Sequence, residues 1–221
     1  MTLLADKLAA LRTRVKLKSE ITALMLRHHE ELQKQLSEHP PLGAGDRFPA
    51  FDLPDHQGVS VRSKDLLAKG PLVVSLFRGT WCPFCSAELH ALNEVYDRIR
   101  GLGAELVVIS PQAPENASAY LSANPVSFRI LVDEDARFAA SLGLAYSFPP
   151  YLEELYRDVF KHDLEKVNAG GSWRLPIPGR FVVDKGETIL DAEYDPDYRY
   201  RPEPADLVSL LADLRAGVDF G

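Results

Sequence analysis

The sequence predicts an α/β fold in which a mixed β-sheet is sandwiched between helices. Short apolar runs typical of buried strands alternate with segments of helical periodicity between residues 72 and 143. This order indicates parallel strands that are covered on both faces. The last two apolar runs are joined through Lys185 and Gly186, as in an antiparallel hairpin. The chain has 221 residues, 46% of them hydrophobic, which is enough for one large core.

The first segment of the chain is expected to form one long amphipathic helix. Residues 3–37 contain no Gly or Pro. Apolar residues recur there at helical spacing, namely at Leu4, Leu8, Leu11, Val15, Ile21, Met25, Leu32 and Leu36. The stretch 39-HPPLGAG-45 ends the helix, because consecutive prolines cannot continue it. We therefore expect residues 1–40 to form a helix with its linker and residues 45–216 to form one domain.

The role of this helix has two interpretations. Its basic residues between positions 7 and 18 are compatible with binding to a membrane surface or with a mitochondrial transit peptide. Glutamates balance the second half, which favours a docking or dimerisation helix instead. An apolar stripe of this size must be covered by its own domain or by a second copy of the chain. We predict a homodimer.

Composition and charge exclude several classes of protein. The formal charge of −7 argues against a nucleic-acid partner, which requires a concentrated basic face. Asp6, Lys7 and Arg12 interrupt any apolar core of signal-peptide length. The longest apolar run, residues 72–77, is far shorter than the about 20 residues that cross a bilayer. The sequence therefore predicts a cytoplasmic protein with no membrane partner.

The elements after the linker follow from local patterns. Two short extended pieces within residues 46–63, joined by a turn at Gln57 and Gly58, precede a short helix at 64–69. Strands are predicted at 72–77, 105–110 and 128–133, and helices at 84–103, 114–124 and 134–143. A hairpin of residues 180–184 and 188–194 and a helix from about residue 205 to 216 complete the domain.

The two cysteines of the chain, Cys82 and Cys85, form a Cys-x-x-Cys motif directly after the strand at 72–77. Pro83 suits the first turn of the following helix, whose free N–H groups favour a thiolate. Arg78 adds a positive charge nearby. We expect an accessible thiolate of low pKa with a second thiol within reach. A zinc site and inert buried thiols are the alternatives, although none of the six histidines recurs at ligand spacing near the pair.

The order strand, Trp-Cys-Pro-x-Cys, helix, strand resembles that of the thioredoxin superfamily. Within it, the stretches 46-DRFPAFDLPDHQG-58, 78-RGTWCPFC-85 and 88-ELHALNEVYDRIRGLGAELVVIS-110 resemble the alkyl hydroperoxide reductase and peroxiredoxin branch. Together with 171-GSWRLPIPGRFVVD-184, they look like the peroxiredoxin-like proteins that carry a Cys-x-x-Cys. The resemblance covers residues 45–215 and implies a thioredoxin-like fold of the peroxiredoxin type.

The chain also departs from the typical peroxiredoxin pattern. Without gaps, Cys85 falls at the peroxidatic position, Cys82 at the usual Thr, and Arg78 at the usual Pro. The family's Arg falls near Pro178, which resembles the cis-proline of thioredoxins. Thr80 and Arg180 lie close by in sequence and could substitute as hydroxyl and guanidinium.

These departures leave two assignments of the nucleophile. Thioredoxin chemistry makes Cys82 the attacking thiolate, and this is the assignment we favour. The peroxiredoxin alignment makes Cys85 attack and Cys82 resolve. In either case the two cysteines close a disulfide.

The region 146–176 is longer than a minimal thioredoxin fold needs. Apolar and aromatic residues in its first half suggest a helix over the active-site end, and residues 168–173 suggest a mobile loop. One interpretation is a lid that shapes a hydroperoxide pocket with Trp81 and Trp173. The other is a surface helix with a connecting loop.

The resemblance implies reduction of hydrogen peroxide or an organic hydroperoxide through Cys82 and Cys85, with thioredoxin or a similar dithiol as reductant. It implies no metal, flavin or nucleotide cofactor. A thiol:disulfide oxidoreductase acting on protein disulfides is the first alternative. A non-catalytic redox sensor or partner-binding module is the second.

Overall fold

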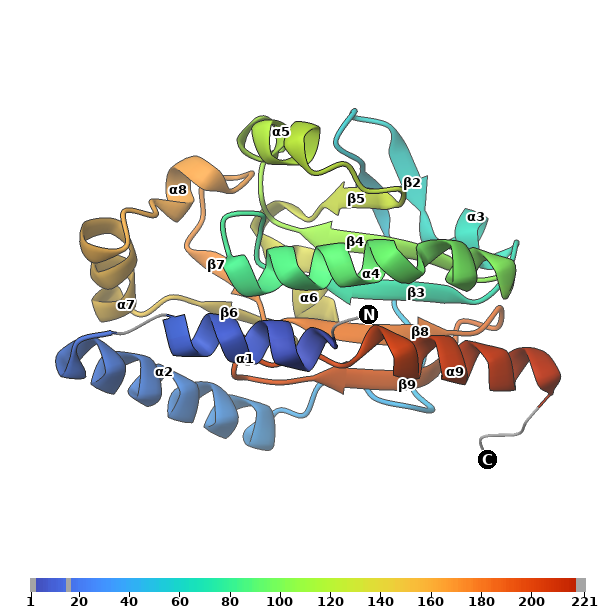
Figure 1. Cartoon of the computed structure of the whole chain (residues 1–221), viewed down its shortest axis with the longest axis horizontal. Coiled ribbons are helices and arrows are strands. Elements are labelled where there is room, and N and C mark those ends of the chain that lie inside the picture. Colours follow the sequence, from blue (N-terminus) through green and yellow to red (C-terminus); the bar gives the residue numbers. More distant parts are fainter. Residues whose placement is uncertain (1–2, 15–16, 218–221) are drawn as a thin grey trace.

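A five-stranded mixed β-sheet with helices on both faces forms the centre of the molecule (Figure 1). The structure is a computed structural model that describes residues 3–14 and 17–217. The strand order is β5 (Arg129–Val132), β4 (Glu105–Ser110), β3 (Leu72–Leu76), β8 (Gly179–Val183), β9 (Ile189–Tyr194). The three strands β3, β4 and β5 are parallel, whereas β8 and β9 run antiparallel to their neighbours. The mixed sheet and the hairpin predicted from the sequence are therefore confirmed.

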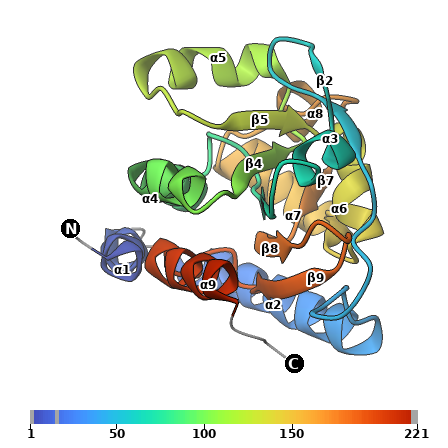
Figure 2. The same cartoon turned by 90° about the vertical axis from the view of Figure 1, so that its right-hand side faces the viewer.

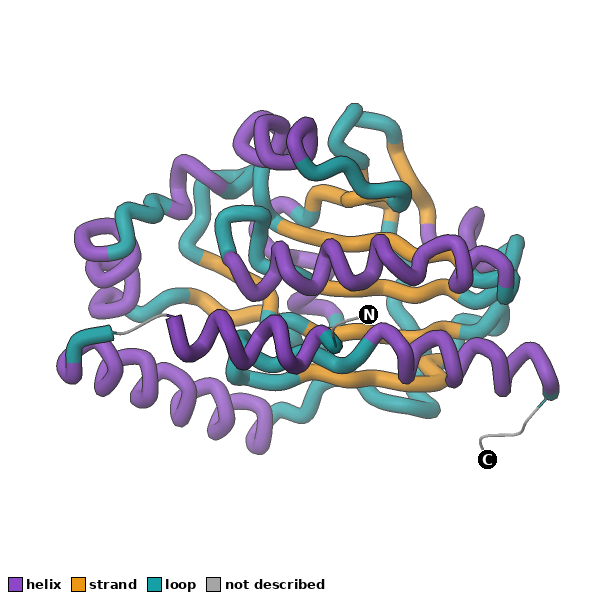
Figure 3. The backbone as a smooth tube through the Cα atoms, in the orientation of Figure 1, coloured by secondary structure: helices purple, strands orange, loops and turns teal. Residues whose placement is uncertain are grey.

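The sheet separates two hydrophobic cores. All five residues of β3 are buried, and successive side chains point to opposite faces. Leu72, Val74 and Leu76 belong to one core, and Val73 belongs to the other. An apolar strand without alternation is typical of a sheet that is covered on both faces, and Figure 3 shows the strands enclosed by helices.

Helices α1 (Leu4–Arg14), α4 (Pro83–Gly101) and α9 (Pro204–Ala216) cover one face of the sheet. Helices α2 (Ser19–Glu38), α6 (Arg137–Ser141) and α7 (Pro150–Glu154) contribute to the core on the other face. Figure 2 shows α1, α4 and α9 on one side of the sheet and α6 and α7 on the other. The remaining elements are the helices α3 (Ser63–Leu67), α5 (Pro114–Ala123) and α8 (Leu164–Val167), the 3₁₀ turn η1 (Glu134–Ala136), the π-helix η2 (Leu155–Val159), and the two-stranded sheets β1 (Asp52–Pro54) with β2 (Ser60–Arg62) and β6 (Ala145–Ser147) with β7 (Arg174–Pro176).

The N-terminal segment differs from the expected single helix over residues 3–37. It forms two helices, α1 and α2, and Leu17 and Lys18 between them are not helical. Leu8 packs in the core beneath α4, whereas Leu32 packs in the core on the opposite face of the sheet. Because the two helices serve opposite faces, the chain must turn between them. A periodic apolar pattern does not reveal such a turn. Val15, one member of the expected stripe, lies outside the described residues.

Helix α1 is held in place by its own chain. The carboxylate of Glu203, which precedes α9, accepts hydrogen bonds from the backbone N–H groups of Leu4 (3.1 Å) and Ala5 (2.6 Å). These groups have no partner within a helix, and a carboxylate also complements the positive end of the helix dipole. Leu4, Leu8 and Leu32 of the expected stripe are buried within the chain itself, and the homodimer stays a prediction.

No helix within residues 3–14 and 17–217 combines the length and the apolar character needed to span a membrane.

We expect Leu8→Ala to lower the free energy of unfolding by about 2–5 kcal/mol, because the Leu8 side chain is 1% exposed and its removal leaves a cavity under α1. Leu3→Ala is the matched control, since Leu3 is 54% exposed, and its effect should stay within about 0.5 kcal/mol. Urea denaturation of the reduced protein measures both. Equal effects of the two substitutions would show that α1 does not dock as described.

Candidate active site

The Cys-x-x-Cys motif lies where β3 ends and α4 begins, at the carboxyl edge of the parallel strands. Cys82 is the residue that precedes α4, and Pro83 occupies the first helical position, where its missing N–H costs nothing. Gly79 in the preceding loop has φ +142°, and a β-carbon there would collide with the indole of Trp81. The loop thus requires glycine at position 79 to bring Trp81 and Cys82 to the helix start.

The hydroxyl of Thr80, considered from the sequence as a partner of the thiolate, is hydrogen-bonded to another side chain. Gln112, which follows β4, accepts hydrogen bonds from the backbone N–H of Thr80 (2.7 Å) and from its hydroxyl (3.1 Å). The hydroxyl of Ser86 donates to the Thr80 carbonyl (2.9 Å). These bonds fix the loop, so Thr80 positions the motif and its hydroxyl is already occupied.

Both cysteines are free thiols and both are buried, with Cys82 2% and Cys85 1% exposed. The expectation of an accessible thiolate is therefore wrong for this conformation. The sulfur of Cys85 accepts from the backbone N–H of Arg78 (3.5 Å) and from the guanidinium of Arg201 (3.3 Å). A substrate reaches these sulfurs only when neighbouring side chains move.

The guanidinium of Arg78 is 1% exposed and lies in a cage of aromatic rings. Its central carbon is 4.3 Å from the ring centre of Tyr198, 5.1 Å from that of Trp81 and 5.5 Å from that of Tyr156. The hydroxyl of Tyr156 accepts a hydrogen bond from it. Within the described residues Arg78 forms no salt bridge with a carboxylate. A buried cation without an anionic partner is costly, so this cage favours a negative charge close by.

The nearby thiol of Cys82 supplies that charge. Burial alone raises the pKa of Cys82, but a hydrogen bond from Cys85 and the positive charges of Arg78 and Arg201 outweigh it and lower the pKa to about 5. Burial and the adjacent negative charge of Cys82 raise the pKa of Cys85 well above its ordinary value. At neutral pH the pair is therefore a Cys82 thiolate and a protonated Cys85.

A second buried cation, Arg201, lies on the Cys85 side of the pair. Its guanidinium forms a salt bridge of 2.6 Å with Glu88, one turn further along α4, and both side chains are less than 5% exposed. The same group donates to the Tyr200 carbonyl (2.6 Å) and to the Cys85 sulfur. Arg201 thus links the loop after β9 to the redox motif.

Arg180 and Pro178 do not have the places or conformation expected of them. Arg180 is paired across the sheet with Glu193 and donates to the Glu203 carbonyl (3.1 Å), so it does not contact the sulfurs; Arg201 does. Pro178 is buried beside β8, but no described peptide bond is cis, so the expected likeness to a cis-proline is wrong.

Trp81 and Trp173 have different immediate surroundings. Trp81 lines a groove of about 880 Å³ that also touches Pro83 and residues of α1 and α4. Trp173 packs against Phe148, with ring centres 5.7 Å apart, and lies under the guanidinium of Arg157. The segment 168–173 is tied down by a hydrogen bond from the Ala169 N–H to the Pro111 carbonyl (2.8 Å).

The sequence did not reveal five residues that build the site: Glu88, Gln112, Tyr156, Tyr198 and Arg201. Four of them lie 27 or more positions after Cys85, on segments without a motif. Glu88 opens the stretch 88–110 that carries the family resemblance and stands one helical turn after Cys85, but it was not named as a site residue. Within the described residues, no group of three or more His, Cys, Asp and Glu side chains is placed to hold a metal ion.

Comparison with known proteins points to one family. A model of the AhpC/TSA family matches residues 44–192. Peroxiredoxin Bcp of Escherichia coli strain K12 is 30% identical over 104 residues, which are 47% of this chain and 66% of that protein. The thiol-disulfide oxidoreductase ResA of Bacillus thuringiensis strain Al Hakam is 27% identical over 101 residues, which are 45% of this chain and 57% of that protein. The chain thus matches less than two thirds of the length of either relative.

Solved structures show the same fold. The peroxidoxin BcpB of Mycobacterium tuberculosis superposes with a TM-score of 0.59 and 22% identity, over 79% of this chain and 97% of that one. The thioredoxin-like architecture of the peroxiredoxin type is therefore confirmed.

The low pKa of Cys82 predicts how the protein reacts with iodoacetamide. The rate should be constant above about pH 6 and fall as the pH drops through about 5, because only the thiolate reacts. Arg78→Met should move this midpoint upward by about 1 to 3 pH units, since it removes a positive charge beside the sulfur. Stopped-flow alkylation followed by mass mapping measures the profile.

Arg180→Met is the control, because Arg180 is equally buried but is paired with Glu193. Its profile should match that of the unmodified protein. An Arg78→Met profile with an unshifted midpoint would contradict the assignment of Arg78 as the source of the low pKa.

Proposed function

The chain belongs to the AhpC/TSA family of thiol-based redox proteins, and we propose that it is a peroxidase that reduces hydrogen peroxide or an organic hydroperoxide with the Cys82 thiolate. One observation carries this proposal. The buried guanidinium of Arg78 has no carboxylate partner among the described residues and lies beside a thiol whose pKa is lowered to about 5. Such a site maintains a reactive thiolate at neutral pH.

The proposed reaction has two steps in the protein. The Cys82 thiolate attacks the terminal oxygen of R–O–OH, the O–O bond breaks, and the leaving alkoxide takes up a proton to give R–OH. Cys82 becomes a sulfenic acid. The thiol of Cys85 then attacks this sulfur, forms the Cys82–Cys85 disulfide, and releases the oxygen as water. Two electrons pass from the dithiol to the peroxide, and a reducing dithiol later returns them.

The neighbours of each sulfur suit its proposed role. Arg78 stabilises the Cys82 anion before attack and is placed to stabilise negative charge on the peroxide oxygen as the O–O bond breaks. Cys85 stays protonated until Cys82 is oxidised, because the negative charge of Cys82 helps to raise its pKa. Once that charge is gone, Arg201 at 3.3 Å favours ionisation of Cys85 for the second step.

Burial of the pair supports a small oxidant over a protein disulfide. With Cys82 2% exposed, a peroxide needs only a modest movement of the surrounding rings, whereas the disulfide of a folded protein must bring its own backbone to the sulfur. The reductant must still reach the disulfide. The groove at Trp81 and Pro83 is the surface we assign to a thioredoxin-like dithiol protein.

A thiol:disulfide oxidoreductase acting on proteins is the second candidate. The low pKa of Cys82, the first cysteine of the motif, and the similarity to ResA both favour it. Insulin reduction in the presence of dithiothreitol distinguishes the two functions. The proposed peroxidase turns over peroxide steadily and reduces insulin no faster than dithiothreitol alone.

The order of attack predicts different outcomes for two single substitutions. Cys82→Ser should abolish the reaction with hydrogen peroxide. Cys85→Ser should still form one sulfenic acid per chain, which dimedone traps, but should lose turnover with thioredoxin, thioredoxin reductase and NADPH. Mass spectrometry and NADPH consumption measure these results. A trapped sulfenic acid in Cys82→Ser, with none in Cys85→Ser, would assign the attack to Cys85 instead.

A further inference from the structure

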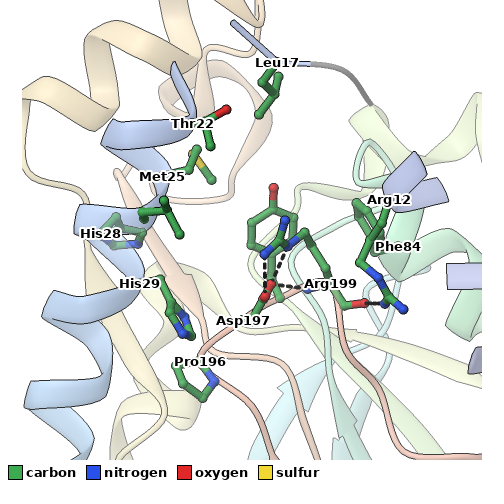
Figure 4. Close-up of a pocket in the computed structure, with 12 residues that line it drawn as sticks. Arg12, Leu17, Thr22, Met25, His28, His29, Phe84, Pro196, Asp197 and Arg199 are labelled. Carbon is green, nitrogen blue, oxygen red and sulfur yellow. Dashed lines mark hydrogen bonds and ion pairs between the residues drawn. The ribbon is translucent and has the colours of Figure 1, made fainter. Parts of the chain in front are cut away.

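A cavity of about 520 Å³ lies beside the redox motif, between the N-terminal helices and the loop that follows β9. Its apolar lining comes from Leu17, Met25, Leu26, Phe84 and Tyr198. In Figure 4, Thr22 and Met25 project from α2 toward the side on which Phe84 and Arg12 lie. The volume and the mainly apolar lining are typical of a pocket for a small organic molecule.

The cavity is built almost entirely by parts of the chain outside the family match. Among the described residues, 12 line the cavity, and Phe84 alone of these falls within residues 44–192. Seven lie before residue 44, in α1, in α2 and between them, and four belong to the stretch 196–199. The cavity is therefore a feature of this chain's additional segments and not of the common fold.

Polar groups in the wall show what kind of molecule fits. The charged groups already have partners: Arg199 donates to Asp197 at 2.7 and 2.8 Å, and Arg12 donates to the Arg199 carbonyl at 3.0 Å and stacks on Tyr200. His28 also lines the cavity and is 7% exposed, yet neither of its ring nitrogens has a hydrogen-bond partner in the described structure. Burial and the charge of Arg78 lower the pKa of His28 to about 4, so its imidazole is neutral at pH 7.

An apolar side chain at the rim adds a second indication. Leu26 is 52% exposed although it lines the cavity, and an exposed leucine next to an apolar hollow gains from being covered. A neutral, compact, largely apolar molecule with one hydrogen-bonding group matches the apolar rim, the paired charges and the unpartnered His28. It covers Leu26, leaves the paired charges undisturbed, and offers a partner to His28.

The cavity is connected to the dithiol through two side chains. Phe84 stands between Cys82 and Cys85 in the motif, and its ring centre is 5.7 Å from that of Tyr198. Tyr198 in turn lies against the guanidinium of Arg78, at 4.3 Å. A change of the motif on disulfide formation therefore acts on one wall of the cavity.

We propose that this cavity is a binding site for a neutral, compact, mainly aromatic or branched-apolar organic molecule with a single hydrogen-bonding group, and that its affinity depends on the oxidation state of Cys82 and Cys85. By linkage, the bound molecule changes the stability of the disulfide by the same factor. The binding site is compatible with either candidate function, because it is inferred from the residues that line the cavity and not from the identity of the oxidant.

Fluorescence titration with N-phenyl-1-naphthylamine, a neutral aromatic probe with one N–H donor, tests the site on the full chain. We expect one probe per chain and a dissociation constant that differs about fivefold or more between the dithiol and the disulfide forms. Leu26→Asp should weaken binding about tenfold or more, because it places a charge at the apolar rim. Val59→Asp is the matched control, since Val59 is 51% exposed and lies outside the cavity, and it should leave binding unchanged.

Met25→Trp fills the same space from the inner wall and should also abolish binding, with thermal unfolding as the check that the variant is folded. Unchanged probe affinity in both Leu26→Asp and folded Met25→Trp would overturn the site. Equal affinities of the dithiol and disulfide forms would overturn the coupling.

Measurements of KM distinguish whether the natural ligand is part of the peroxide substrate or a separate effector. If the molecule is the organic part of a hydroperoxide substrate, Leu26→Asp raises KM for cumene hydroperoxide and leaves KM for hydrogen peroxide unchanged. If it is a separate effector, both values of KM stay unchanged, while probe binding is still lost. A protein without any peroxidase activity that binds the probe as described would refute the proposed function and retain the site.

Discussion

The buried guanidinium of Arg78 and the thiolate beside it at Cys82 form the interaction on which the rest of the site depends. A cation that is 1% exposed must be compensated, and no carboxylate in the described structure compensates it. Aromatic faces and the Tyr156 hydroxyl supply part of the compensation, and the anionic sulfur supplies the remainder. Disulfide formation removes this anion while Arg78 keeps its charge. The pair therefore favours the reduced form, which makes the disulfide the more oxidising.

Segments that are distant from the motif in sequence contribute to this charge pair. The region 146–176, considered above as a lid, contributes Tyr156, the hydrogen-bond partner of Arg78. The loop after β9 contributes Tyr198 on one side of the sulfurs and Arg201 on the other. Helices α1 and α2 pack on opposite faces of the sheet and enclose the cavity beside Phe84. Arg78 comes from the motif's own loop, whereas Tyr156, Tyr198 and Arg201, which complete its electrostatics, come from segments that are distant in sequence.

The sequence predicted those features that local pattern determines. The strands at 72–76 and 105–110 and the helix that starts at Pro83 follow from apolar runs, proline placement and cysteine spacing. Local pattern does not tell which of Arg180 and Arg201 contacts the sulfurs, because that depends on cross-strand pairing. Arg180 lies directly opposite Glu193 and forms an ion pair with it. The burial of Cys82 and the aromatic cage around Arg78 were also hidden, since the rings at positions 156 and 198 reach Arg78 only through the tertiary fold.

The most direct measurement of the central claim is a site-resolved titration of the two thiols. Reduced protein labelled with carbon-13 at the cysteine β-carbons, with single Cys→Ser variants for assignment, gives the pKa of each sulfur from its chemical shift against pH. We expect the Cys82 resonance to titrate near pH 5 and the Cys85 resonance to remain that of a thiol through neutral pH. A Cys82 resonance that remains that of a thiol at pH 7, or a Cys85 that ionises first, would contradict the account.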